Sequence, residues 1–175
     1  MAGKYTTLNK GLIVKMRKVN FGCGEEYKEG WINLDYRDNI KKDIKHDLNK
    51  FPYPFKNNEI DVAYIKNTIA FLEDPIKVIK ELARVTKKGG QIIISTPHAI
   101  SYSYLSGLGH THHFTENTFR DYTMKEYEIE NILKFEGYKF TYTNKWKKFI
   151  PLKKYLKIFL RGLYDDIEFK FSVIK

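Results

Sequence analysis

Cysteine, arginine and long apolar runs are scarce in this sequence. Its one cysteine, Cys23, has no partner for an internal disulfide. No N-terminal stretch resembles a signal peptide, and no apolar run is long enough for a membrane-spanning helix, so we expect a cytoplasmic protein. Only five of the 31 basic residues are arginine. Because arginine is preferred for bidentate contacts to phosphates and bases, a nucleic-acid partner is not favoured.

The length and composition predict one globular domain. A chain of 175 residues with 42% hydrophobic residues can bury a substantial core. We interpret residues 1–175 as a single domain in which residues 1–17 are an N-terminal extension.

The net charge of +10 is concentrated at the C-terminal end. From Lys139 onward there are ten basic and three acidic residues. Residues 147–165 are predicted to form a basic amphipathic helical segment with an apolar face. That face could cover the last strands of a sheet, or the segment could rest on an anionic membrane surface. We favour the first interpretation because the flanking strands need a cover.

A glycine turn between two short apolar strands is the most informative motif. Residues 19–24 read Val-Asn-Phe-Gly-Cys-Gly, and residues 30–35 end on the carboxylate of Asp35. Glycines allow a sharp turn that brings backbone N–H groups to a ligand, and a terminal carboxylate suits a ribose diol. Asp35 lies only thirteen residues after Gly22, whereas dinucleotide sites place their acid about 20 residues after the motif. The spacing disfavours NAD and FAD and suits S-adenosylmethionine.

Strand and helix patterns alternate along the rest of the chain. Such alternation predicts an α/β fold with a mostly parallel sheet covered by helices on both faces. The expected elements are strands at 61–65, 91–97, 138–146 and 167–173, a helix from Pro75 that ends at 87–90, and a helix over 123–135. The strand at 91–97 is apolar on both faces and is therefore expected to be central.

Residues 18–98 resemble the class I S-adenosylmethionine-dependent methyltransferases, and most closely the type 11 group. The similarity is carried by the glycine turn, by the strand that ends at Asp35, by Asp47-Leu48, by Leu72 to Pro75, and by Gly89 to His98. It implies a Rossmann-like sheet of strand order 3-2-1-4-5-7-6 with one antiparallel strand. The cofactor-binding residues that the resemblance implies are Phe21, Gly22, Cys23, Gly24, Asp35, Tyr36, Asp47, Leu48 and Asn67.

The sequence departs from this group after the fourth strand. Members commonly have His-x-x-Glu-His there, whereas this chain has Asn-Thr-Ile-Ala-Phe at residues 67–71. The catalytic candidates are then His98, His110 and His113, because a histidine that titrates near neutrality can take the proton of a hydroxyl acceptor. His110 to Thr115 resembles a His-x-x-His-Phe-Thr segment of enzymes associated with glycan or cell-envelope methylation. We expect no metal site, because neither a cysteine nor a clear acidic ligand accompanies these histidines.

The hypothesis that we favour is an S-adenosylmethionine-dependent methyltransferase acting on a small-molecule or glycan-like acceptor, with O-methylation expected. Two alternatives stay open. One is a nucleic-acid methyltransferase, suggested by the basic C-terminal region. The other is a non-catalytic cofactor-binding protein of the same fold, suggested by the missing His-x-x-Glu-His. The sequence does not determine the oligomeric state.

Overall fold

The computed structural model describes residues 6–8, 12–14, 16–142, 145–156 and 162–175. The strands are β1 (Thr6–Leu8), β2 (Leu12–Val14), β3 (Lys18–Phe21), β4 (Ile32–Asp35), β5 (Ile44–Lys45), β6 (Ile60–Lys66), β7 (Thr86–Pro97), β8 (Leu133–Thr141) and β9 (Asp166–Val173). The α-helices are α1 (Pro75–Val85), α2 (Tyr102–Ser106), α3 (Asp121–Glu126) and α4 (Lys153–Leu156). Short 3₁₀ helices are η1 (Ile69–Phe71), η2 (Ile129–Asn131) and η3 (Lys145–Phe149).

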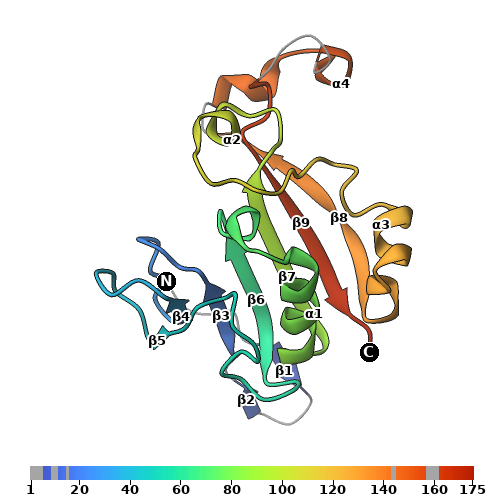
Figure 1. Ribbon diagram of the computed structural model, residues 1–175. Coiled ribbons are helices and arrows are strands. Elements are labelled where there is room, and N and C mark those ends of the chain that lie inside the picture. The colour runs from blue at the N-terminus through green and yellow to red at the C-terminus, as the bar shows by residue number, and fades with distance from the viewer. Residues whose placement is uncertain (1–5, 9–11, 15, 143–144, 157–161) are drawn as a thin grey trace.

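Seven strands form one mixed sheet (Figure 1), in the order β5-β4-β3-β6-β7-β9-β8. The pairs from β5 to β7 are parallel, and β9 is antiparallel to both of its neighbours. Numbered within the sheet, this is the order 3-2-1-4-5-7-6, so the predicted fold class and strand order are confirmed. The predicted central place of the 91–97 strand is also correct, because β7 lies between β6 and β9.

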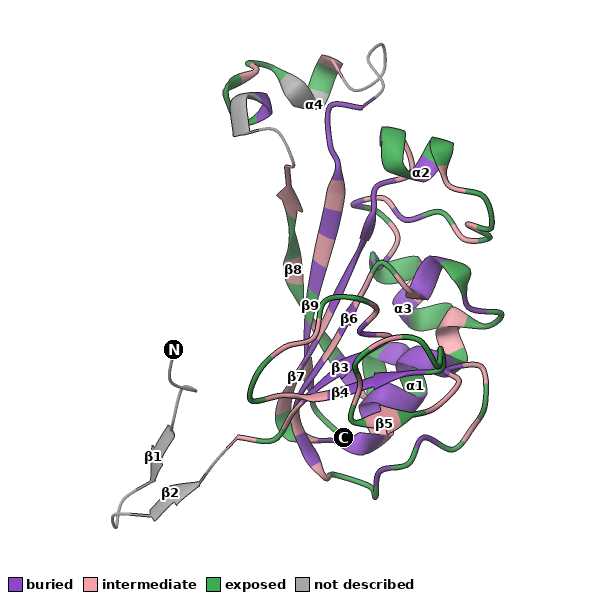
Figure 2. Cartoon of the chain, turned by 90° about the vertical axis from the view of Figure 1, so that its left-hand side faces the viewer, coloured by how far each residue is buried: buried purple, intermediate pink, exposed green. Residues whose placement is uncertain are grey.

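The helices α1, α2 and α3 lie on one side of this sheet (Figures 1 and 2), whereas the sequence predicted helices on both faces. The three connections between β3, β4, β5 and β6, all of them within the described range 16–142, contain no helix and run as irregular loops. On the opposite face β9 presents polar residues, among them Glu168 and Lys170, that alternate with buried apolar residues. Alternation of this kind is typical of a sheet with one solvated face.

The main core lies between the sheet and the helix layer. Val19, Ile65, Ile92 and Phe169 project from the strands, each without exposed area, and pack with Ile79 and other residues of α1 in one apolar cluster. Burial of this apolar area is the principal favourable contribution to folding. The cluster fixes the relative positions of β3, β6 and β7, and the carboxyl ends of β3 and β6 help to build the site.

The helix α1 begins where the sequence predicted. The side chain of Asp74 accepts a hydrogen bond from the Lys77 N–H at 2.9 Å, and Pro75 occupies the first helical position. The helix ends at Val85, two residues earlier than predicted, because Thr86 takes an extended conformation and pairs with Ile60.

The prediction of a helix over 123–135 is wrong. The helix α3 ends at Glu126, η2 follows, and β8 begins at Leu133. Pairing with β9 from Leu133 onward supplies backbone hydrogen bonds and buries Leu133, which outweighs the local helical pattern. The predicted strand 138–146 therefore starts earlier and also ends earlier, at Thr141.

The segment 147–165 shows only one short α-helix, α4, among its described residues, and 157–161 lie outside the described range. Leu152 and Tyr155, placed by the sequence on a face that covers the sheet, are 68% and 58% exposed. The expectation of a covering face is therefore wrong for these two residues, whereas Leu163 of the same predicted face is buried and Phe159 lies outside the described residues. Within the described part of the N-terminal extension, β1 and β2 pair antiparallel with one another in a two-stranded sheet separate from the main sheet.

Candidate functional site: a cofactor cavity at the carboxyl ends of the strands

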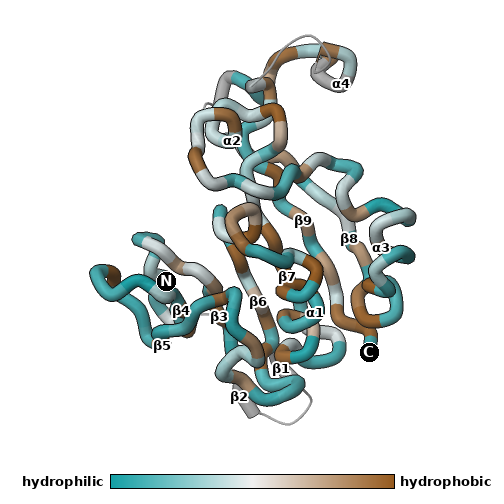
Figure 3. Tube along the Cα trace, in the orientation of Figure 1, coloured by the Kyte–Doolittle hydropathy of each residue, from teal (hydrophilic) through white to brown (hydrophobic). Residues whose placement is uncertain are grey.

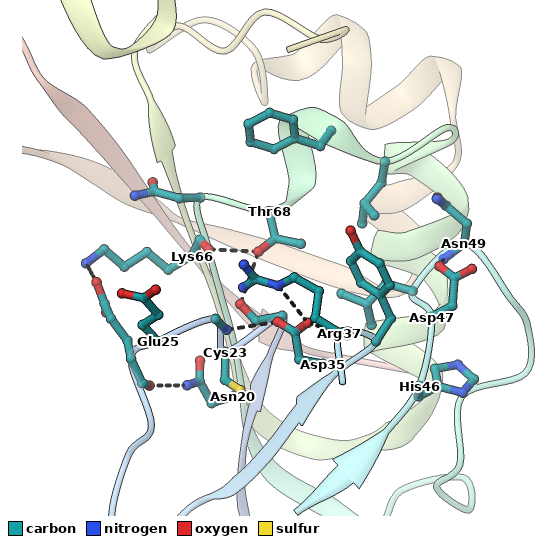
Figure 4. Close-up of a pocket in the computed structure, with 18 residues that line it drawn as sticks. Asn20, Cys23, Glu25, Asp35, Arg37, His46, Asp47, Asn49, Lys66 and Thr68 are labelled. Atoms are coloured by element: carbon teal, nitrogen blue, oxygen red, sulfur yellow. Dashed lines mark hydrogen bonds and ion pairs between the residues drawn. The ribbon is translucent and has the colours of Figure 1, made fainter. Parts of the chain in front are cut away.

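A cavity of about 860 Å³ opens at the carboxyl ends of β3, β4 and β6 (Figure 4). Ligands bind at this end of the sheet in open α/β folds. Eight of the nine residues implied by the resemblance line the cavity: Gly22, Cys23, Gly24, Asp35, Tyr36, Asp47, Leu48 and Asn67. Phe21 does not line it, because its side chain is fully buried in the core against Tyr53 and Phe55.

The glycine turn is held by close contact with the end of β6. Gly22 and Gly24 have φ angles of +66° and +55°, which residues with a Cβ rarely adopt. A Cβ on Gly22 would lie 2.5 Å from the Thr68 hydroxyl oxygen. That hydroxyl is 2.9 Å from the Lys66 carbonyl and 3.2 Å from the Gly22 carbonyl, both of which can accept its hydrogen. A side chain at position 22 would therefore collide with Thr68, so only glycine lets the backbone of the turn lie this close to the end of β6.

Buried asparagines stabilise the loop that replaces a helix after the turn. The Asn20 amide donates to the Glu26 carbonyl at 2.9 Å and to the Asn33 side-chain oxygen at 3.1 Å. The Asn33 amide in turn donates to the Lys28 carbonyl at 3.0 Å and to Asp43 at 3.1 Å. These bonds satisfy buried polar groups and hold the loop beside the cavity.

Asp35 projects from the end of β4 with only 4% of its surface exposed. One carboxylate oxygen accepts the Gly24 N–H at 2.9 Å, and the other accepts the Arg37 N–H at 3.0 Å and the Arg37 Nε at 3.3 Å. Burial raises the pKa of this carboxyl, but the Arg37 and Gly24 donors more than offset it, so that the pKa lies below its usual range. Asp35 is therefore an ionised hydrogen-bond acceptor at neutral pH.

The Arg37 side chain lies across the approach to Asp35. A Cβ on Gly24 would lie 3.0 Å from a guanidinium nitrogen, and in Figure 4 the guanidinium lies between Asp35 and Thr68. Since the Arg37 side chain is 43% exposed, it can swing into solvent when ribose hydroxyls reach the carboxylate. Arg37 was not among the residues expected at the site, although its place two positions after the acid was a usable signal.

Acidic and basic side chains share the mouth of the cavity. Glu25 and Glu26 line it, and Glu26 forms an ion pair with Lys66. Burial, followed by the charge of Asp35, raises the pKa of the Cys23 thiol, which is therefore a poor nucleophile. Carboxylates beside a glycine turn suit the ammonium group of a cofactor such as S-adenosylmethionine better than a pyrophosphate. The cavity therefore fits that cofactor.

The three predicted catalytic histidines occupy different environments. The His110 ring lies 4.2 Å from the ring of Phe71, which lines the cofactor cavity. His113 lines a neighbouring cavity of about 530 Å³ beside α1 and α3. His98 is buried; its Nε2 lies 3.0 Å from Glu116, and its Nδ1 accepts the Ile100 N–H at 3.3 Å.

Of these three histidines, His110 is the one adjacent to the cofactor cavity. Its Nδ1 lies 3.2 Å from the Gly107 carbonyl, and because a carbonyl can only accept, Nδ1 is the donor in this hydrogen bond. The loop is anchored by the Thr111 N–H, which donates to the Ala70 carbonyl at 2.9 Å. This leaves Nε2 of His110 as the proton-accepting nitrogen of the ring.

Comparison with known proteins agrees with the fold. A family model described as a methyltransferase domain matches residues 20–94. An uncharacterised protein of Methanocaldococcus jannaschii is 49% identical over 41 residues, a stretch that spans 23% of this chain and 20% of that protein.

Solved structures share the architecture along most of the chain. An S-adenosylmethionine-dependent methyltransferase from Mesorhizobium loti has a TM-score of 0.60 and 16% identity, with 90% of each chain covered. A putative methyltransferase from Bacillus halodurans has a TM-score of 0.62 and 14% identity, over 93% of this chain and 94% of that one. The cyclase SpnF has a TM-score of 0.57 and 10% identity, over 91% of this chain and 75% of that one. At these identities the likeness establishes the fold. The segment that matches the methyltransferase family model, residues 20–94, contains the glycine turn, Asp35 and the other residues that line the cavity.

Proposed function

We propose that this protein transfers a methyl group from S-adenosylmethionine to a hydroxyl group of a small-molecule or glycan-like acceptor. The observation that carries the proposal is the place of His110, which packs on Phe71 at the rim of the cofactor cavity with Nδ1 bound to a carbonyl. A hydroxyl acceptor must lose its proton as its oxygen attacks, and a neutral imidazole can accept it.

In the proposed reaction one group of residues holds the cofactor and another residue accepts the proton of the acceptor. In this proposal the glycine turn and the nearby acids hold the methionine end, Asp35 accepts hydrogen bonds from the ribose, and Asp47 and Leu48 contact the adenine. The cofactor supplies an electrophilic methyl group. Because its leaving group is already good, correct positioning of the acceptor provides much of the acceleration, and His110 removes the proton.

Methyl transfer is not the only activity that this fold supports, since a cyclase shares it. A non-catalytic cofactor-binding protein is the second candidate, and the missing His-x-x-Glu-His motif favours it. Release of S-adenosylhomocysteine in a screen of hydroxylated small molecules and glycans separates the candidates. Release that depends on an acceptor supports the enzyme, whereas cofactor binding without turnover across the screen supports the binding protein.

We expect Asp35→Asn to weaken S-adenosylmethionine binding by about 1–3 kcal/mol, because the variant loses a charged acceptor for the ribose hydroxyls. Isothermal titration calorimetry measures the change. The matched control is Asp38→Asn, which removes a neighbouring carboxylate whose side chain is 81% exposed and should leave the affinity unchanged. Equal affinity for wild type and Asp35→Asn would exclude Asp35 from the ribose site.

The same aspartate has a pH signature. Its folded pKa is depressed, so the stability that its ionised form contributes is present above the ordinary aspartate pKa and is lost as the pH falls through the folded value. The contribution of ionised Asp35 to the cofactor affinity should therefore stay constant across the neutral pH range, as calorimetry at several pH values would show.

We expect His110→Ala to lower kcat by about 100-fold or more, with the cofactor affinity unchanged, because only proton removal is lost. Single-turnover kinetics with the best acceptor from the screen, together with calorimetry, separates the two quantities. His113→Ala is the matched control, since that ring lines the other cavity. If both variants turned over at the wild-type rate, His110 would not be the base, and positioning alone would account for the activity.

A further inference from the structure

Two segments with exposed apolar residues lie beyond the carboxyl ends of the central strands, where α2 and α4 stand at the top of Figures 1 and 3. We call this surface the apical patch, and it consists of Tyr102, Leu105, Leu108, Phe149, Leu152 and Tyr155. Leu108 is 98% exposed and Phe149 is 83% exposed. Single exposed apolar residues are ordinary, but a gathering of large ones at one end of a protein marks an interaction surface.

Two segments far apart in the sequence contribute the apical patch. Residues 102–108 include α2 and the turn after it, and residues 149–155 run from η3 into α4. Both segments leave the sheet at the same end, because Pro97 and Thr141 each pair with Asp166 of β9, and the Gly162 N–H donates to the Ile100 carbonyl at 2.8 Å. A Cβ on Gly162 would lie 2.3 Å from the Tyr102 ring, so this ring packs directly against the backbone at Gly162.

The charge of these segments is of one sign. Residues 142–164 contain seven lysines and arginines and no carboxylate, and residues 99–115 contain neither a carboxylate nor a lysine or arginine. One of the seven, Lys147, is buried and paired with Asp165 at 2.6 Å, and Lys148 beside Phe149 is exposed. Apolar side chains among basic residues are typical of a surface that rests in the headgroup region of an anionic membrane.

The exposure of these apolar residues argues against the alternative, in which they cover β8 and β9. If α4 covered β8 and β9, Leu152 and Tyr155 would be buried against the sheet, as Phe169 and Phe171 are on its helical side. Instead both are more than half exposed. No described helix is long and apolar enough to cross a bilayer. Contact with a membrane would therefore be peripheral.

We propose that the apical patch docks on an anionic lipid surface. Apolar side chains such as Phe149, Leu152 and Leu108 enter the headgroup region, and the net positive charge of residues 142–164 attracts the negative lipids. The patch and the cofactor cavity lie at the same end of the sheet, and the loop of His110 joins them through its contacts with Phe71 and Tyr104. Docking therefore brings the mouth of the cavity to the lipid surface.

The test is co-sedimentation of the 175-residue protein with vesicles of phosphatidylcholine alone or of phosphatidylcholine mixed equally with phosphatidylglycerol. We expect binding to the anionic vesicles at physiological salt, little binding to the neutral vesicles, and a decline as added salt screens the lysines. Lysines near an anionic surface each contribute roughly a fivefold change in affinity. The combined substitution of Lys153, Lys154 and Lys157 by Gln should therefore weaken binding by about 100-fold.

Two further variants separate the apolar contribution from general charge. Phe149→Ser with Leu152→Ser should reduce vesicle binding by about tenfold or more, with the thermal transition and the cofactor-induced shift unchanged. Lys80→Gln with Lys88→Gln removes charge near a cavity at the opposite end of the sheet and should leave vesicle binding within about twofold of wild type, because those lysines lie away from the apical patch.

Three results would overturn the proposal. One is the absence of binding to anionic vesicles at physiological salt, and another is equal loss in the Lys80 and Lys88 control. The third is a dimer in light scattering that Phe149→Ser with Leu152→Ser dissociates, with no vesicle binding, because the patch would then join two copies of this chain. Vesicle binding needs neither cofactor nor acceptor, so its failure is independent of the proposed methyl transfer.

Discussion

Gly22→Ala is expected to abolish the stabilisation of this protein by S-adenosylmethionine. The new Cβ would lie 2.5 Å from the Thr68 hydroxyl oxygen and 2.7 Å from its methyl carbon, and both atoms belong to a side chain that is bound to the end of β6. Overlap of this kind costs about 1–3 kcal/mol. The left-handed conformation costs an alanine about 1–2 kcal/mol more. The least costly relief moves the turn into the cavity that it lines.

Thermal unfolding with and without S-adenosylmethionine measures this effect. The matched control is Gly30→Ala, because Gly30 also has a positive φ, of +75°, but a Cβ added there would meet no heavy atom within 4 Å, and Gly30 does not line the cavity. This control should show the backbone cost alone and keep the full cofactor shift. A full cofactor shift in Gly22→Ala would mean that the turn does not touch the cofactor.

Phe21→Ala is expected to lower the free energy of unfolding by about 3–5 kcal/mol, the range for truncating a buried aromatic residue. The Phe21 ring has no exposed area and lies 5.7 Å from the ring of Tyr53 and 5.8 Å from that of Phe55. Its removal leaves a void between the sheet and the 51–55 loop. Chemical denaturation followed by circular dichroism measures the loss.

Phe149→Ala is the matched control for this truncation, because the Phe149 ring is 83% exposed and its loss should change stability by no more than about 0.5 kcal/mol. The experiment also decides the role of Phe21. The resemblance placed it among the cofactor-binding residues, whereas the structure places its side chain in the core. A Phe21→Ala variant that keeps its stability but loses cofactor affinity would show instead that the side chain belongs to the cofactor site.

The loops between β3 and β6 that line the cavity, all within the described range 16–142, contain no helix, and buried side-chain hydrogen bonds hold them in place instead. The loop between β5 and β6 has no helix and is held to α1 by Glu81, which accepts the Tyr53 N–H at 2.6 Å. The Arg84 guanidinium donates to the Tyr53 and Phe55 carbonyls at 3.3 and 3.1 Å. The residues that would face the adenine, Asp47 and Leu48, therefore depend on contacts with the helix layer.

The sequence determined those features that depend on local chemistry. Glycines at positions 22 and 24, an acid at the end of the next strand and an alternation of short apolar runs predicted an α/β sheet and an S-adenosylmethionine site, and the family resemblance that they carry implied the strand order. The Asp74-Pro75 start of α1 was equally local, because a capping carboxylate and a preset φ act within one helical turn. These features need few contacts from elsewhere in the chain.

Only the tertiary structure decided what depends on distant partners. The last residues of the helix predicted at 123–135 belong instead to β8, because β9, which lies much later in the chain, supplies backbone hydrogen-bond partners along its whole edge. The histidines share a residue type and a neighbourhood in the sequence, yet Phe71, Glu116 and the second cavity give His110, His98 and His113 different surroundings. The same principle applies to Phe21 and Leu152, since a pattern marks an apolar residue but only packing determines whether a core covers it.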